Sequence, residues 1–193
     1  MMKYKFSLFV FLLSLFLVSG QTKNEREFKI KPSELPQNVE KLLTPYLQDA
    51  KRIRFYQEID GDKKSFEAKF KKGRLHYSVE FDSKGILEDV EFKITPADIP
   101  EASWSNILQY LEKNFEKFSV KKIQQQYPIL NKSTNEVLTE AFQNLILPYI
   151  NYELIVSAKK EKGYEQFEIL FNAEGEFINR RKSIRSKYDH VLY

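Results

Sequence analysis

The chain has 193 residues, of which 42% are hydrophobic, 15% aromatic and 30% charged, and it contains no cysteine. This composition is too apolar for a disordered chain, and the length allows one domain or two small ones. The net charge is +4; without Lys3 and Lys5, in the first twenty residues, 29 basic side chains remain against 27 acidic ones, a net of +2. Such a small excess argues against nonspecific nucleic-acid binding, which needs a concentrated basic face.

Residues 1–20 have the layout of a secretory signal peptide. Two lysines precede an apolar run from Phe6 to Val18, and the small residues Ser19 and Gly20 suit cleavage after Gly20. A retained membrane anchor is the alternative, but the run is shorter than the ~20 apolar residues of a spanning helix. A lipoprotein would need a cysteine at the cleavage point. We therefore expect a periplasmic or secreted protein with no membrane anchor after cleavage.

The first half of the mature chain predicts a helix followed by a four-stranded meander. Residues 21–33 are charged and unpatterned, which favours a flexible leader. Residues 36–50 have helical hydrophobic spacing, and Pro45 is expected to kink or end this helix near Thr44. Period-two alternation then predicts four strands, at residues 52–59, 66–71, 74–81 and 86–94. The side chains that this alternation turns toward the helix include Ile53, Phe55, Phe66, Phe70, Tyr77, Val79 and Phe81.

The second half predicts two helices and four strands. After a linker at 95–100, a helix from Ser103 to about Lys117 places Trp104 in the core. A capping box of Ser133 and Glu136 opens a further helix, expected to reach Leu147. Its inward side chains are expected to be Val137, Leu138, Ala141, Phe142, Leu145 and Ile146. The predicted strands are residues 119–127, 152–159, 164–171 and 176–184.

The two halves repeat each other in sequence. Aromatic, aliphatic, turn and glycine positions of residues 77–85 match those of residues 167–175, and Ile99-Pro100 repeats Leu35-Pro36 before a helix. The predicted fold class is α+β, a tandem repeat of a helix plus a four-stranded antiparallel meander, with an extra helix inserted in the second unit. The corresponding domain prediction is a first unit at 34–95, a second unit at 96–185 and a tail at 186–193.

On these motifs, which span most of residues 34–184, the chain resembles the PepSY-like family of secreted bacterial proteins. That family is similar in fold to the β-lactamase inhibitor protein, whose tandem units join into a concave surface that grips an enzyme. The resemblance implies a concave sheet surface and a binding role. It carries over no binding residue position by position, so inhibition remains an analogy of fold.

Motifs for catalysis, metal binding or cofactor binding are missing from the sequence. His76 and His190 are the two histidines, and neither has a partner at metal-ligand or catalytic-triad spacing. The mature glycines fall in predicted turns and not in a phosphate-binding loop. We therefore expect no enzyme activity, no metal and no cofactor.

The polar face of the first predicted sheet is the candidate partner-binding face. Arginine and tyrosine commonly anchor protein interfaces, whereas an ordinary solvated face with cross-strand ion pairs is the alternative. The sequence favours an exported, non-enzymatic module that binds a protein or peptide of the cell envelope, with inhibition of an envelope hydrolase as one form of that binding. The candidate residues are Arg52, Arg54, Tyr56, Lys69, Arg74 and His76.

Two other functions remain open at this point. One is an envelope accessory or small-ligand-binding protein, which an apolar pocket near Phe142 and Leu145 would favour. The other is an unrecognised enzyme, which a buried pair of titratable groups would favour. A wide polar concavity would favour the binding module.

Overall fold

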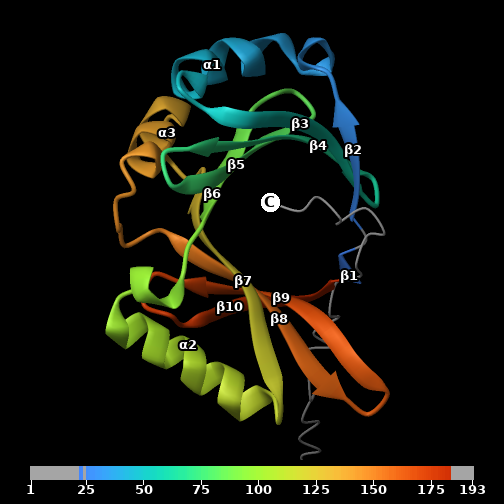
Figure 1. The fold of residues 1–193 in the computed structure, drawn as a ribbon, viewed down its shortest axis with the longest axis vertical. Coiled ribbons are helices and arrows are strands. Elements are labelled where there is room, and N and C mark those ends of the chain that lie inside the picture. The colour runs from blue at the N-terminus through green and yellow to red at the C-terminus, as the bar shows by residue number, and fades with distance from the viewer. Residues whose placement is uncertain (1–21, 24, 184–193) are drawn as a thin grey trace, which may run out of the picture.

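The computed structural model describes residues 22–23 and 25–183, which form one ten-stranded sheet with three α-helices on its outer side (Figure 1). The strands are β1 (Thr22–Lys23), β2 (Glu25–Ile30), β3 (Lys51–Asp60), β4 (Lys63–Lys72), β5 (Leu75–Asp82), β6 (Leu87–Lys93), β7 (Phe118–Pro128), β8 (Asn151–Lys160), β9 (Gly163–Asn172) and β10 (Phe177–Ser183). The helices are α1 (Gln37–Leu47), α2 (Glu101–Asn114) and α3 (Thr134–Phe142), with short 3-10 turns at Pro32–Glu34 and Pro96–Asp98. The predicted signal peptide, its cleavage site, His190 and the tail at 186–193 lie outside the described residues.

The strand order is β1-β10-β9-β8-β7-β6-β5-β4-β3-β2. Strands β2 to β10 are antiparallel, and β1 runs parallel to β10. The two predicted meanders thus share a single sheet, because β6 pairs with β7 along Asp89↔Pro128 to Lys93↔Gln124.

The N-terminal segment brings the two edges of this sheet together. β1 lies at one edge and β2 at the other, yet only residue 24 separates them in the chain. Two residues span at most about 7 Å, so the edges meet at this point and the sheet curls around its inner face (Figure 1). Residues 25–30, predicted to be part of a flexible leader, are instead a paired strand. The sequence did not predict this strand because the strand buries no large apolar side chain: Phe28 is 45% exposed and Ile30 is half-buried.

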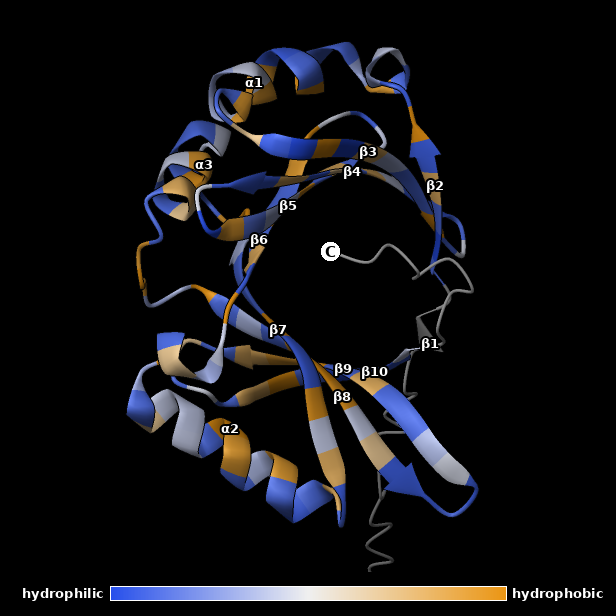
Figure 2. Cartoon of the chain, viewed as in Figure 1, coloured by the Kyte–Doolittle hydropathy of each residue, from blue (hydrophilic) through white to orange (hydrophobic). Residues whose placement is uncertain are grey.

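The outer face of the sheet carries the hydrophobic core, as the strand alternation predicted. Phe81, Val79 and Phe92 are fully buried there against the helices, and Figure 2 shows hydrophobic residues alternating with hydrophilic ones along these strands. Phe142 of α3 joins the layers, since its ring lies 4.8 Å from that of Tyr77 in the sheet and 4.5 Å from that of Tyr46 in α1. None of the helices in the described part of the chain is both long and apolar enough to cross a membrane.

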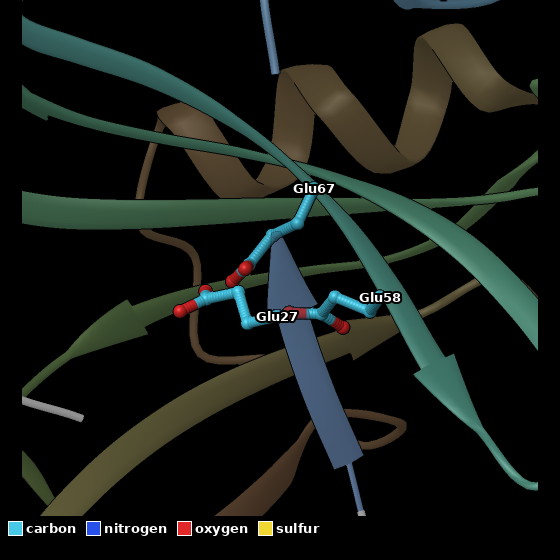
Figure 3. A group of neighbouring side chains, drawn as sticks. All are labelled: Glu27, Glu58 and Glu67. Atoms are coloured by element: carbon cyan, nitrogen blue, oxygen red, sulfur yellow. The ribbon is translucent and has the colours of Figure 1, made fainter. Parts of the chain in front are cut away.

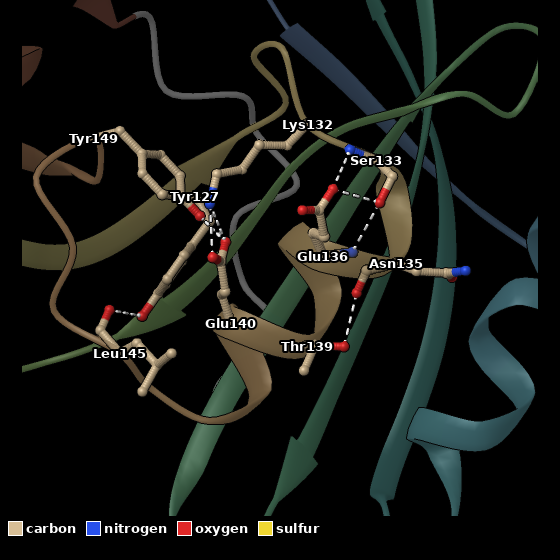
Figure 4. A network of polar contacts seen from close by, with 9 residues as sticks. All are labelled: Tyr127, Lys132, Ser133, Asn135, Glu136, Thr139, Glu140, Leu145 and Tyr149. Carbon is tan, nitrogen blue, oxygen red and sulfur yellow. Dashed lines mark hydrogen bonds and ion pairs between the residues drawn. The ribbon is translucent and has the colours of Figure 1, made fainter.

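Helix α3 begins where the capping box predicts but ends five residues early. Ser133 and Glu136 cap its start, and Lys132 binds Glu140 at 2.6 Å (Figure 4). The helix ends at Phe142, and Asn144 has a positive φ of 54°. The predicted continuation to Leu147 is therefore wrong, and Leu145 and Ile146, predicted to point inward, are 37% and 57% exposed. The carbonyl of Leu145 instead accepts a hydrogen bond from the Tyr127 hydroxyl at 2.7 Å.

Three further local predictions are corrected. Helix α1 continues through Pro45 to Leu47, so the proline does not end it at Thr44. A β-bulge with Arg52 at φ 58° shifts the register of β3 and leaves Ile53 40% exposed instead of buried. Trp104 is only half-buried at the edge of the core, because the buried face of α2 is centred on Ile107 and Leu111.

Candidate functional site

A polar cavity of about 470 Å³ occupies the concave face of the sheet. Its walls come from β2 to β8, so both halves of the chain contribute. Most of the residues that line it are charged, which distinguishes this face from the apolar outer one. They are Glu25, Glu27, Arg52, Arg54, Tyr56, Glu58, Glu67, Lys69, Phe70, Lys71, His76, Tyr77, Ser78, Glu80, Glu91, Lys93, Lys122, Gln124 and Glu153.

Five of the six predicted partner-binding residues line this cavity, and their role in binding stays a prediction. Those five are Arg52, Arg54, Tyr56, Lys69 and His76. Arg74 does not belong to the lining: it lies exposed in the turn between β4 and β5. Tyr56 is on the expected face but only 5% exposed, with the Lys69 ammonium 4.9 Å from its ring centre. It therefore offers a partner little surface.

Three carboxyl groups, those of Glu27, Glu58 and Glu67, come together on strands β2 to β4 (Figure 3). Lys69 Nζ is 2.8 Å from Glu67 Oε2 and also pairs with Glu27, while Ser78 donates a hydrogen bond to Glu67. Burial would raise the pKa of Glu67, but the Lys69 charge and these hydrogen bonds lower it to about 2. Burial and the neighbouring Glu67 charge raise the pKa of Glu58 far above its ordinary value. Glu58 is therefore a protonated acid beside an ionised carboxylate.

These three carboxyl groups could contribute ligands to a cation. One ligand oxygen from each of Glu27, Glu58 and Glu67 lies within 4.8 Å of the others. The Lys69 ammonium already pairs with two of them, so a positive charge of the chain itself balances the cluster.

A second buried carboxyl group lies where the two halves of the sheet meet. Glu91 of β6 is 5% exposed, and Gln124 Nε2 of β7 donates a hydrogen bond to its Oε2 at 2.6 Å. Burial, followed by the charges of Glu153, Asp89 and Glu80, raises the pKa of Glu91 well above its ordinary value. These effects disfavour ionisation of the Glu91 carboxyl group.

The accessible part of the concave face carries charges of both signs, since Glu25, Glu27 and Glu80 of the lining are half-buried. Arg52 and Lys93 are exposed, and Lys71, His76 and Lys122 are half-buried. Burial, then the charges of Lys71, Lys93 and Arg52, lower the pKa of His76. These basic side chains come from five neighbouring strands, β3 to β7.

At the position where the sequence suggested an alternative pocket, the ring of Phe142 packs against the rings of Tyr46, Phe70 and Tyr77. A more apolar hollow of about 720 Å³ does occur, but it lies between α1 and the β2–β3 edge, lined by residues such as Leu43, Leu47 and Ile53. This position differs from the one that the sequence suggested.

Sequence analysis missed the contribution of the second half to this site. Lys122, Gln124 and Glu153 were not among the candidates, although the strands that carry them were predicted. The alternation along each strand could have found them once β6 was paired with β7. The position of Glu25 and Glu27 beside the cavity had no such signal, because their strand buries no large apolar side chain.

Solved structures share this fold. A DUF2874 family protein from Bacteroides ovatus matches with a TM-score of 0.52 at 11% identity, over 81% of this chain and 93% of that chain. Another DUF2874 family protein, from Bacteroides uniformis, has a TM-score of 0.52 at 15% identity, over 77% and 89%. A BLIP-like protein from Bacteroides fragilis has a TM-score of 0.48 at 14% identity, over 80% and 90%.

Comparison of sequences does not assign the chain to a family. No protein-family model matches the chain, and no curated protein matches it. The structural likeness establishes the mixed fold of helices on an antiparallel sheet, and the resemblance to the PepSY-like family stays a prediction.

Proposed function

We propose that the chain is an exported, non-enzymatic binding protein that holds a protein or peptide segment of the cell envelope on the concave face of its sheet. The observation that carries this proposal is the polar cavity of about 470 Å³, with charged side chains from both halves of the chain. A concave polar surface was the feature expected of a binding module. Small-molecule pockets, in contrast, are mostly apolar.

Export is proposed from the sequence of residues 1–20, which have the charged, apolar and small-residue segments of a cleavable signal peptide. Intact mass of the exported protein tests this directly: a chain beginning at Gln21 is expected, and one retaining Met1 contradicts it.

A tandem repeat of the PepSY-like kind is proposed from two matching anchor points. In the first unit, Asn38 Nδ2 of α1 donates a hydrogen bond to the Gly85 carbonyl at 2.7 Å. In the second, Ser103 Oγ of α2 donates one to the Ala173 carbonyl at 2.8 Å, and a Cβ on Gly175 would lie 2.1 Å from the Ser103 carbonyl oxygen. In both units, the start of the helix contacts a glycine turn of its own meander, which supports a repeated unit.

An enzyme is the second candidate, because Glu58 and Glu67 form the buried titratable pair that would favour catalysis. Their exposed fractions are 6% and 4%, and Glu67 is held by Lys69 and Ser78. A general acid or base must reach the proton that it transfers. We therefore assign this pair a structural role in shaping the cavity.

Because the sequence has no cysteine, single cysteines can report which face touches a partner. A photocrosslinker is attached to Arg54→Cys in the cavity or to the matched control Lys113→Cys on α2, and each mature protein is exposed to the envelope fraction of its source. We expect a discrete crosslink from position 54 that excess unlabelled protein removes. Crosslinks from position 113 alone, or from neither position, would overturn the proposal.

The affinity for that crosslinked partner then tests the anchors. Arg54→Ala is expected to weaken binding by about 1–3 kcal/mol with an unchanged melting temperature. Tyr56→Ala is a poorer probe than the sequence suggested, because its side chain is buried and its loss would also lower stability.

A further inference from the structure

We propose that the apolar hollow between α1 and the β2–β3 edge binds a long-chain fatty acid, with the acyl chain in the hollow and the carboxylate at its rim. We call this site the α1 hollow. Residues 29–32, one side of α1 from Glu40 to Gln48, and residues 53–55 line it. The concave cavity shares Arg54 with it, but the ligand is of another class, so the inference goes beyond the proposed function.

The α1 hollow has the size and the lining of a pocket for an apolar ligand. Its volume is about 720 Å³, and ligand pockets commonly have ~300–1,000 Å³ and predominantly apolar walls. Leu43 of the lining is fully buried, and Ile30, Leu47 and Phe55 are half-buried. These apolar walls distinguish the hollow from the concave cavity, whose lining is mostly charged.

The β-bulge in β3 adds an exposed apolar side chain to the lining. The register of β3 on β4 shifts between Lys51 and Arg54, and Arg52 within the shift has a φ of 58°. Bulges redirect side chains near the edges of sheets. Ile53, which follows Arg52, lines the hollow and is 40% exposed. An acyl chain in the hollow would remove this side chain from water, which is favourable.

The charged residues of the lining suit a carboxylate. Three of them are cations, Lys29, Lys31 and Arg54, and one is an anion, Glu40. Among the described residues, no hydrogen bond or ion pair engages the side-chain nitrogens of these three cations. Lys29 and Lys31 are exposed, and a lysine can lay its methylene groups on an apolar surface while its ammonium stays in water. The same two residues can therefore contact both the acyl chain and its headgroup.

A fatty acid satisfies both parts of the lining in one molecule. A wholly apolar ligand would leave the lysines without a counter-ion, and a small anion would leave Leu47 and Ile53 in contact with water. A protein partner needs a continuous surface of ~800 Å² on each side. The hollow is instead bordered along α1 by exposed polar residues, Glu40, Thr44 and Gln48.

The test titrates the mature chain with cis-parinaric acid, a fluorescent fatty acid. Palmitate, or hexadecanol with the same chain length and no charge, then displaces this probe. Ile53→Glu places a carboxylate in the lining at a position that the fold already exposes. Its matched control is Ile86→Glu, in the turn between β5 and β6, where the isoleucine is 56% exposed.

We expect saturable binding of the probe and displacement by palmitate. Ile53→Glu should weaken binding at least about tenfold, because a charge would have to be buried against the acyl chain, and Ile86→Glu should leave the affinity unchanged. Thr44→Trp, which fills the hollow from α1, is a second variant and should give a similar loss.

The rim is tested with Lys29→Gln/Lys31→Gln. Two exposed ion pairs are lost, so this variant should weaken palmitate binding by about threefold to tenfold and leave hexadecanol binding unchanged. Its control, Lys41→Gln/Lys113→Gln, removes two exposed charges outside the lining and should lose little.

Three results would each overturn the inference: no saturable binding by the parent, equal affinity of Thr44→Trp and the parent, or hexadecanol displacing the probe as well as palmitate does. Equal losses in Ile53→Glu and Ile86→Glu would also overturn it. None of these results bears on the concave face, which the crosslink from position 54 tests separately.

Discussion

The two faces of the sheet are built from the same strands but are stabilised by different interactions. On the outer face, large apolar side chains such as Phe81 and Phe92 are excluded from water by the helices. On the inner face, charged side chains are buried as well, because the closed sheet brings them together. Packing of large apolar side chains therefore stabilises the outer face, and pairing of opposite charges stabilises the inner face.

The largest expected effect is a cavity in the outer face. Phe81→Ala removes a fully buried ring and should lower the free energy of unfolding by about 3–5 kcal/mol. Trp104→Ala, expected from sequence to cost as much, should cost only about 1–3 kcal/mol because the side chain is half-buried. Chemical denaturation measures both, and equal losses would mean that Trp104 belongs to the core after all.

On the inner face, the corresponding test removes Lys69, the cation that pairs with the carboxylates of Glu67 and Glu27. Lys69→Met leaves Glu67 and Glu27 without their ammonium partner and should cost about 2–3 kcal/mol, since breaking a buried pair strands a charge. The control is Lys63→Met, whose partner is Glu88 and whose side chain is 60% exposed; it should cost less than about 1 kcal/mol.

Adding Glu67→Gln to Lys69→Met removes the stranded carboxylate and should recover part of the loss. No recovery in the double variant would show that Lys69 stabilises by packing on Tyr56 and not by charge.

A smaller effect, with a definite dependence on pH, is expected at Glu91. Its pKa is raised in the folded state, so its stabilising contribution is complete below the unfolded value and is lost as pH rises through the folded pKa. Glu91→Gln cannot ionise, so it should raise the melting temperature relative to the parent by about 2–4 °C near pH 8. Near pH 4 the gain should vanish.

Glu67→Gln is the control, because its effect on stability should depend on pH in the opposite direction. The pKa of Glu67 is lowered to about 2, so the parent has the full benefit of the carboxylate above the unfolded value and loses it as pH falls through the folded pKa. This variant should therefore be less stable than the parent near pH 8. A gain in stability there would contradict the assignment of Glu67 as the ionised member of its pair.

The sequence predicted the outer face better than the inner one, for a physical reason. Alternation along a strand identifies which side chains share a face, and it placed Phe66, Tyr77 and Phe81 correctly. It also placed Arg54 and His76 together. Alternation carries no information on curvature, so the burial of Glu58 and Glu67 could not be predicted from it.

The smallest expected effect is that of metal removal. No ligand-spaced set was visible in the sequence, yet pairing of β2, β3 and β4 brings Glu27, Glu58 and Glu67 together. Because Lys69 already pairs with two of these carboxyl groups, a divalent cation would have to displace an ammonium. We therefore expect neither excess EDTA nor added calcium to shift the melting temperature of the parent. Lys69→Met opens the cluster and should gain stability from calcium, since a ligand bound only by the folded state raises its melting temperature. A shift of several degrees when EDTA is added to the parent would mean that a cation, and not Lys69, balances this part of the inner face.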